Sequence, residues 1–199
     1  MNKPTELKIA LCGKTRVGKD TVGDYLTKKY GMFQFAFADK LKEMFHDEYT
    51  GIPKHPKPVR GYQLYGQLMR YVYGEDYWVD RCFDYIDSVG KYAYGFKEMG
   101  YEKIPVLRPV ITDVRQQNEV DRCKEEGFIL IRVRAREGVR IARMNQEGDN
   151  FSKEDLDFET EKSIDGFEVD YDIYNNGDLK ELYAQIDEIV NKEAGKVYE

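Results

Sequence analysis

The chain has 199 residues, of which 41% are hydrophobic and 34% are charged, and its formal net charge is −6. This length and composition are typical of a soluble globular protein with a buried core and exclude a disordered chain. The acidic balance argues against a nucleic-acid partner, because proteins that bind polyanions usually carry a positively charged face.

The cysteines and the N-terminal sequence indicate a reducing environment. The three cysteines, Cys12, Cys82 and Cys123, have no metal-binding spacing, and their odd number excludes a complete disulfide framework. The first residues are polar, and no apolar stretch approaches the length of a membrane span. We therefore expect a cytoplasmic protein with free thiols and no membrane partner.

Short apolar runs alternate with amphipathic segments along the chain. In chain order, we expect a strand at residues 7–12, a helix at 19–29, a strand at 32–38, helices at 39–49, 61–73 and 78–89, a strand at 106–112, a helix at 116–126, a strand at 128–135, helices at 138–144 and 152–162, a strand at 171–174 and a closing helix at 179–192. Asp39 is expected to cap the helix that follows it, and residues 152–155 resemble a capping box. Residues 91–103 have no clear period and are interpreted as an irregular excursion.

This alternation of strands and helices predicts an α/β fold. Parallel strands need crossover helices, which cover both faces of the sheet, so we expect three layers around a five-stranded parallel sheet. We find no internal repeat and no linker, and we interpret residues 1–199 as one domain.

One segment has the spacing G-x-x-x-x-G-K and lies between a predicted strand and a predicted helix. Its glycines allow the backbone to fold tightly around phosphate oxygens, while its N–H groups and the helix N-terminus attract the anion. The lysine then reaches the β- and γ-phosphates of ATP. The expected nucleotide-binding residues are Gly13, Lys14, Thr15, Arg16, Val17, Gly18, Lys19, Asp20 and Thr21.

The residue after the lysine departs from the usual pattern. Asp20 stands where Ser or Thr normally follows, and Thr21 comes one residue later. We therefore expect the Thr21 hydroxyl to lie near Mg²⁺. Asp113 is a second candidate, because it follows an apolar run at the carboxyl edge where ligands of open α/β sheets gather. An aspartate that caps a helix is the alternative interpretation of Asp113.

The chain lacks the guanine-binding Asn-Lys-x-Asp motif of switch GTPases and is shorter than a motor or a helicase. A small P-loop protein more often transfers a phosphoryl group to a small molecule. Further short motifs lie in order along the chain: GKDTV at 18–22, FADKLK at 37–42, QLMR at 67–70, DYWV at 76–79, ITDVR at 111–115, NE at 118–119 and DIYNNG at 172–177. In this order and spacing, the sequence resembles the phage-type deoxynucleoside monophosphate kinases, within the nucleoside monophosphate kinase branch of P-loop proteins.

The resemblance implies a three-layer P-loop NTPase fold with a helical arm that binds the acceptor, at about residues 39–89, and a short lid, at about 136–162. Two features depart from it: Lys40 stands where relatives often carry proline, and residues 91–103 look like an insertion. With the resemblance, the candidates for contacts to the acceptor are Asp39, Lys40, Arg70, Trp78, Asp113, Arg115 and Glu161.

Each of these candidates has a structural alternative. Arg70 and Arg115 either grip the acceptor phosphate or form ion pairs. Trp78 either stacks on the acceptor base or packs in a core, as aromatic residues at helical spacing usually do. Glu161 either contacts the acceptor or lies on a solvated face. Arg136, Arg140 and Arg143 are expected to stabilise the transferring phosphoryl group, with a solvated basic face as the alternative.

The sequence therefore predicts an ATP- and Mg²⁺-dependent kinase that phosphorylates a deoxynucleoside monophosphate. The alternatives are a P-loop kinase of another small metabolite and a nucleotide-binding regulatory module with little turnover. The base, the sugar and the oligomeric state stay open, with a homodimer as one possibility.

Overall fold

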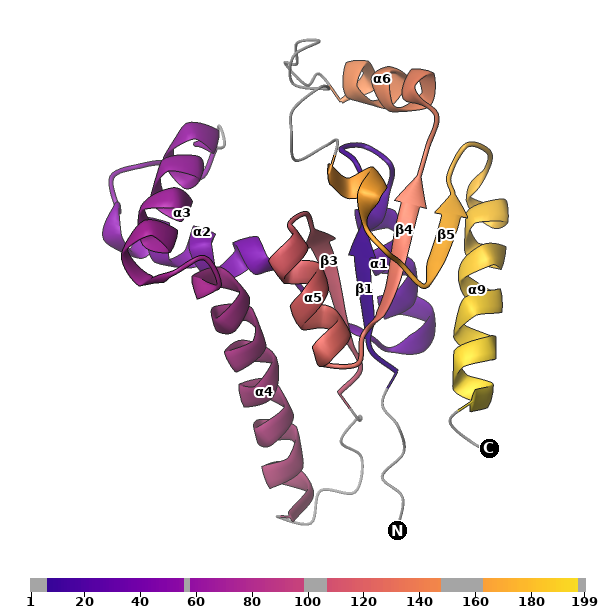
Figure 1. Cartoon of the computed structure of the whole chain (residues 1–199), viewed down its shortest axis with the longest axis horizontal. Coiled ribbons are helices and arrows are strands. Elements are labelled where there is room, and N and C mark those ends of the chain that lie inside the picture. The colour runs from indigo at the N-terminus through magenta and orange to yellow at the C-terminus, as the bar shows by residue number, and fades with distance from the viewer. Residues whose placement is uncertain (1–6, 56–57, 99–106, 148–162, 197–199) are drawn as a thin grey trace. The chain divides into compact units, whose positions relative to one another are not determined.

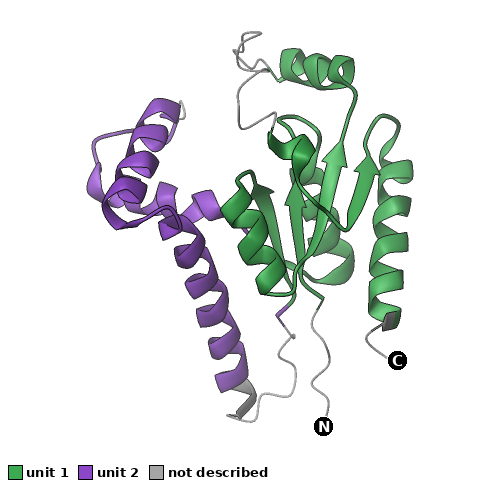
Figure 2. Cartoon of the chain, viewed as in Figure 1, with its two compact units in different colours: residues 1–34, 108–199 green, residues 35–107 purple. Residues whose placement is uncertain are grey.

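The computed structural model describes residues 7–55, 58–98, 107–147 and 163–196 (Figure 1). The chain divides into two compact units (Figure 2). The core unit comprises residues 1–34 and 108–199, and the arm unit comprises residues 35–107. The segment that the resemblance implies as the acceptor arm, about residues 39–89, falls inside the arm unit.

A five-stranded parallel sheet forms the centre of the core unit, as the sequence predicts. Its strands are β1 (Ile9–Cys12), β2 (Phe33–Phe35), β3 (Pro109–Val114), β4 (Ile129–Arg134) and β5 (Tyr171–Tyr174), in the order β2-β3-β1-β4-β5. Strand β1 is central, with Ile9 paired in parallel to Val110 on one side and to Ile129 on the other. Because β1 is buried on both faces, it is a continuous apolar run instead of an alternating one.

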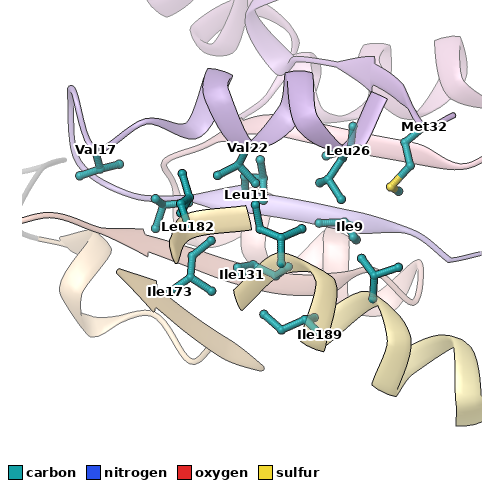
Figure 3. Packing of buried hydrophobic residues seen from close by; sticks show 14 residues of the cluster. Ile9, Leu11, Val17, Val22, Leu26, Met32, Ile131, Ile173, Leu182 and Ile189 are labelled. Carbon is teal, nitrogen blue, oxygen red and sulfur yellow. The ribbon is translucent and has the colours of Figure 1, made fainter. Parts of the chain in front are cut away.

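Helices cover both faces of this sheet. The core unit contains α1 (Lys19–Tyr30), α5 (Gln117–Glu125), α6 (Glu137–Gln146) and α9 (Leu179–Lys196). Figure 3 shows apolar side chains of α1 and α9, such as Leu26, Leu182 and Ile189, packed against the sheet. Helix α5 contacts β4 from the opposite face (Figure 1). The predicted three-layer α/β fold is confirmed.

The described residues of the arm unit form three helices: α2 (Phe37–Glu48), α3 (Val59–Tyr73) and α4 (Tyr77–Glu98). Their core consists of the buried side chains of Phe45, Tyr65 and Trp78. The Trp78 indole is 2% exposed, and its Nε1–H donates to the carbonyl oxygen of Gly66 at 3.0 Å. This indole therefore ties α4 to α3, because a buried N–H without a partner would be costly.

Several predicted boundaries in the first half of the chain are wrong. Helix α2 begins at Phe37 with Ala36 at its N-cap, so the strand expected over 32–38 is only three residues long, and Asp39 lies in the first helical turn instead of capping it. Helix α4 continues to Glu98 through most of the segment interpreted as irregular.

Some predicted elements lie outside the described residues, and others can be compared with the structure. The expected capping box at 152–155 and the helix at 152–162 lie outside the described residues. Within the described residues, no helix combines the length and the apolar composition needed to cross a membrane. Cys12, Cys82 and Cys123 are buried free thiols, as expected.

Candidate functional site

The loop between β1 and α1 has the backbone geometry of an anion-binding nest. Gly13, Arg16 and Gly18 have φ angles of 149°, 63° and 100°. Among the described residues, Arg16 is the one non-glycine residue with a positive φ. This conformation costs about 1–3 kcal/mol and persists only where the surrounding structure compensates for it. Successive N–H groups in such a loop can point to one side and bind an anion. The N-terminus of α1 adds its partial positive charge at the same place.

Lys19, the first residue of α1, lies within this loop. Its side chain is buried, at 8% exposure, although a lysine is normally solvated. The Nζ donates hydrogen bonds to the carbonyl oxygens of Gly13 at 2.7 Å and Lys14 at 3.1 Å. The loop therefore keeps a cation beside the N–H groups that would surround a phosphate.

Three side chains from distant parts of the sequence hold the outer side of the loop. The Arg140 Nε donates to the carbonyl oxygen of Thr15 at 2.7 Å. The Arg143 Nη1 donates to the carbonyl oxygens of Arg16 at 3.2 Å and Val17 at 3.3 Å. The Asn175 Nδ2 donates to the same oxygen of Val17 at 2.8 Å. Helix α6 and the end of β5 are thus bonded to consecutive peptide groups of the phosphate loop.

A cavity of about 220 Å³ lies beside the loop in the core unit. Charged side chains of both signs line it, namely Lys14, Arg132, Arg134, Glu137, Arg140 and Asp165. Lys14 and Asp165 form an ion pair at 2.6 Å, which connects the second residue of the loop to the short helix η1 (Ile164–Gly166). The volume and the cations are suited to a polar, anionic group next to the loop.

An ion pair between a buried arginine and a more exposed aspartate supports this wall of the cavity. Arg132, on β4, is 7% exposed and binds both carboxylate oxygens of Asp172, on β5, at 2.7 and 3.1 Å. Its remaining nitrogen donates to the carbonyl oxygens of Ile164, Asp165 and Phe167. The guanidinium of Arg132 holds the pKa of the Asp172 carboxyl below its usual value, an effect to which Arg134 adds. Burial raises the pKa of the nearby Cys12 thiol to about 11, so this thiol stays protonated at neutral pH.

We predict that Asp172→Asn lowers the free energy of unfolding by about 2 kcal/mol at pH 7, because a charged hydrogen-bond partner of a buried guanidinium is lost. The lowered pKa of Asp172 in the folded protein means that its contribution is present above the unfolded value of about 3.9. This contribution is lost as the pH falls through the folded pKa. Urea unfolding of the parent and the variant between pH 7 and pH 3 measures both effects.

Glu168→Gln is the matched control for this prediction. Glu168 is 93% exposed and pairs with Lys124 at 3.3 Å, so it should change the stability by less than about 1 kcal/mol at any pH. Equal losses in the two variants, or a loss for Asp172→Asn that does not shrink in acid, would contradict a stabilising role of the pair between Arg132 and Asp172.

The predicted acceptor residues of the arm unit differ in their surroundings. Asp39 and Lys40 are on α2 and form surface ion pairs with Lys42 and Glu43. Arg70 is half-buried on α3, and its side chain forms no ion pair with another described residue. Trp78 packs in the core of the arm unit, which favours the structural alternative for this residue.

The remaining predicted residues belong to the core unit, apart from one. Asp113 lies within β3, and α5 is capped by a box formed by Gln116 and Glu119, so the interpretation of Asp113 as a helix cap is wrong. Arg115 is half-buried and follows the strand, and its backbone N–H donates to Glu119. Arg136 is exposed at the N-cap of α6. Glu161 lies outside the described residues, as does the part of the predicted lid after residue 147.

The surroundings of the loop are compatible with Mg²⁺. Within the described segments, no three His, Cys, Asp or Glu side chains gather into a metal-binding cluster. Mg²⁺ does not require one, since it usually keeps several waters and is held by substrate phosphates with one or two protein oxygens. Thr21, half-buried in the first turn of α1, and Asp113, at the carboxyl end of β3, are the two predicted residues that could supply hard oxygen ligands.

Sequence reasoning missed Asn175 and the ion pairs of Arg132 and Lys14. A signal was present for one of these residues. Arg132 lies between apolar residues of β4, where a buried charged residue needs a partner. Asn175 lies in the motif at 172–177 but carries no feature that distinguishes it from a turn asparagine. Lys14 and Asp165 are 151 positions apart, and no local pattern connects them.

Comparisons with known proteins agree with the predicted resemblance. A protein of Acanthamoeba polyphaga mimivirus named "Putative deoxynucleotide monophosphate kinase" is 27% identical over 198 residues, covering 89% of this chain and 93% of that protein. The resemblance to deoxynucleoside monophosphate kinases is thereby confirmed.

Solved structures share the fold. A shikimate kinase from Bacteroides thetaiotaomicron has a TM-score of 0.55 at 14% identity, covering 93% of this chain and 96% of that chain. A gluconokinase from Sinorhizobium meliloti 1021 has a TM-score of 0.52 at 16% identity, covering 98% of each chain. A family model described as an AAA domain matches residues 9–164, which include β1, the phosphate loop and the cavity-lining residues up to Ile164. Because this match spans most of the chain, the chain belongs to the AAA domain family of P-loop proteins.

Proposed function

We propose that this protein transfers the γ-phosphoryl group of ATP to a deoxynucleoside monophosphate. The observation that carries the proposal is the phosphate loop, with its positive φ angles and the buried Lys19 at the N-terminus of α1. The name of the mimivirus relative supports the choice of a deoxynucleotide as the acceptor. The fold that the chain shares with small-molecule kinases supports phosphoryl transfer over slow regulatory hydrolysis.

Phosphoryl transfer requires the protein to position the two anionic reactants and to neutralise their negative charge, and no covalent intermediate is needed. Loop N–H groups would hold the β-phosphate of ATP, and Lys19 would bridge its β- and γ-phosphates. Arg140 donates through Nε to the loop and also lines the cavity, so we assign it to the stabilisation of the transferring phosphoryl group. Arg136 is an exposed cation at the start of the same helix. Mg²⁺, held with the help of Thr21 and Asp113, would neutralise charge on the phosphate oxygens.

A binding site for the acceptor must supply a cation for the phosphate group and contacts that select the base and the sugar. We assign the phosphate contact to Arg70, with Arg115, Asp39 and Lys40 as further candidates. Arg70 is half-buried, and the side chain has no carboxylate partner among the described residues, which leaves a cation for an anionic ligand. An arginine can bind a phosphate through two parallel N–H···O bonds.

An assay of ADP release across the common ribonucleoside and deoxyribonucleoside monophosphates tests the proposed function. We expect turnover with at least one deoxynucleoside monophosphate that exceeds ATP hydrolysis without acceptor by at least about 100-fold, the scale of electrostatic and positional catalysis. Shikimate and gluconate belong in the same panel. Turnover with these compounds alone would assign a metabolite kinase, and no turnover with any acceptor would support a regulatory module.

We predict that Arg70→Ala raises the acceptor KM at least about tenfold, or about 1.4 kcal/mol, since a charged hydrogen bond to the acceptor phosphate is lost. The KM for ATP should change little, because ATP binds at the phosphate loop. Arg60→Ala, an exposed arginine on the same helix, is the matched control and should change neither KM. An equal rise in both KM values would show that Arg70 serves the fold or the donor site.

A further inference from the structure

We propose that Arg143 and Asn175 are positioning residues of the phosphate loop, which orient its N–H groups toward the nucleotide without touching the nucleotide themselves. The sequence places Arg143 with the arginines expected to contact the transferring phosphoryl group. Its contacts in the structure point to a different role. The proposal rests on nucleotide binding by this loop and deepens the proposed function by naming what prepares the loop for binding.

The guanidinium of Arg143 donates its hydrogen bonds to protein oxygens. Its Nη1 is shared between the carbonyl oxygens of Arg16 and Val17, and its Nη2 donates to the backbone oxygen and Oδ1 of Asn175, both at 3.1 Å. Both terminal nitrogens are therefore engaged by the loop and by the end of β5. A guanidinium bound on both sides in this way is a brace between two segments, and it has little freedom to turn toward a substrate.

Asn175 completes the brace. It is 4% exposed, its Nδ2 donates to the carbonyl oxygen of Val17 at 2.8 Å, and its Oδ1 accepts from Arg143. Only one orientation of the amide satisfies both contacts, because the opposite one would place Oδ1 against a carbonyl oxygen and the NH₂ group against a guanidinium. The backbone N–H of Asn175 donates to the carbonyl oxygen of Arg134 at 2.8 Å, which anchors the residue to β4.

These contacts determine the direction of the loop N–H groups. In a trans peptide the C=O and the following N–H point in opposite directions. Holding the carbonyl oxygens of Arg16 and Val17 toward Arg143 and Asn175 therefore turns the N–H groups of Val17 and Gly18 to the other side, where a phosphate would bind. Arg16 has a φ of 63°, which an arginine rarely adopts, and the hydrogen bonds from Arg143 offset the cost of that conformation.

Equilibrium binding of Mg·ADP and Mg·ATP, measured by titration calorimetry on the full chain, tests the proposal. Loop N–H groups bind the α- and β-phosphates, which both nucleotides possess. We expect Arg143→Ala and Asn175→Asp to weaken ADP and ATP binding by the same factor, about tenfold, the scale of a charged hydrogen bond. Arg143→Lys should recover part of the affinity, because an ammonium can still donate to one or two of these oxygens. The acceptor KM should not change.

Asn145→Ala is the matched control, since Asn145 is exposed on α6 two positions after Arg143. Melting temperatures of all variants identify any that fail to fold, and Arg143→Lys keeps the test open if Asn175→Asp does not fold. Unchanged ADP affinity with weaker ATP binding or a lower kcat would place Arg143 on the γ-phosphate and overturn the proposal. A lower melting temperature with unchanged affinity for both nucleotides would make the brace purely structural and also overturn it.

The same titration separates this inference from the proposed function. If the parent chain binds ADP and ATP but phosphorylates no nucleoside monophosphate, the proposed acceptor is wrong and the positioning role is still measured by the variants. If the parent chain binds neither nucleotide, both proposals are wrong.

Discussion

Lys19→Ala is expected to lower kcat/KM by at least about 100-fold, the scale of removing one preorganised donor to a developing charge. The Lys19 ammonium is held by the carbonyl oxygens of Gly13 and Lys14 and would bridge the β- and γ-phosphates of ATP. The substitution removes the ammonium that would lie beside these phosphates. The fold should persist, because Lys19 is not part of the hydrophobic core cluster. Steady-state kinetics with saturating acceptor measures the loss, and thermal unfolding should show a melting temperature within a few degrees of the parent protein.

Lys28→Ala is the matched control, because Lys28 is an exposed lysine in the last turn of the same helix. This variant should keep the activity of the parent protein. Turnover of Lys19→Ala close to that of the parent would remove the phosphate loop from the mechanism, whatever its geometry.

Gly13→Ala is expected to disrupt the loop through a steric clash and backbone strain together. A Cβ at this position would lie 2.5 Å from the carbonyl oxygen of Val133 and 2.9 Å from Cγ2 of Val17, and the φ of Gly13 is 149°. Val133 belongs to β4, whose backbone is held in the sheet on both sides and cannot move away. We expect a loss of about 3 kcal/mol in the free energy of unfolding and at least tenfold weaker ATP binding, from overpacking and backbone strain together.

Gly127→Ala separates strain from steric clash. Gly127 also has a positive φ, 76°, but no atom lies within 4 Å of the Cβ that an alanine would add. This variant should lose only about 1 kcal/mol and keep its affinity for ATP. Denaturant unfolding and nucleotide titration of both variants test the comparison, and equal effects would mean that the approach of β4 to Gly13 is unimportant.

The sequence by itself determined the parts of this protein that depend on local patterns. Three local patterns follow one another directly in the sequence: the apolar run of β1, the spacing of Gly13, Gly18 and Lys19, and the amphipathic period of α1. Together they predict a phosphate loop and its place on a parallel sheet. The alternation of strands and helices likewise predicts the three layers. The boundaries of β2 and α4 were missed, because short strands and glycine-containing helix ends depend on tertiary packing more than on propensity.

Only the tertiary structure decided which charged residues act together. The hydrogen bonds of Arg140, Arg143 and Asn175 to the loop span 125 to 158 positions in the sequence. Arg132 and Asp172 are 40 positions apart and meet because β4 and β5 are neighbours in register. Sequence patterns identify a basic helix after β4, but they cannot distinguish a guanidinium that faces a substrate from one that braces the backbone. That distinction depends on which carbonyl oxygens lie within hydrogen-bond reach, and this follows from the packing of α6, β5 and the phosphate loop against one another.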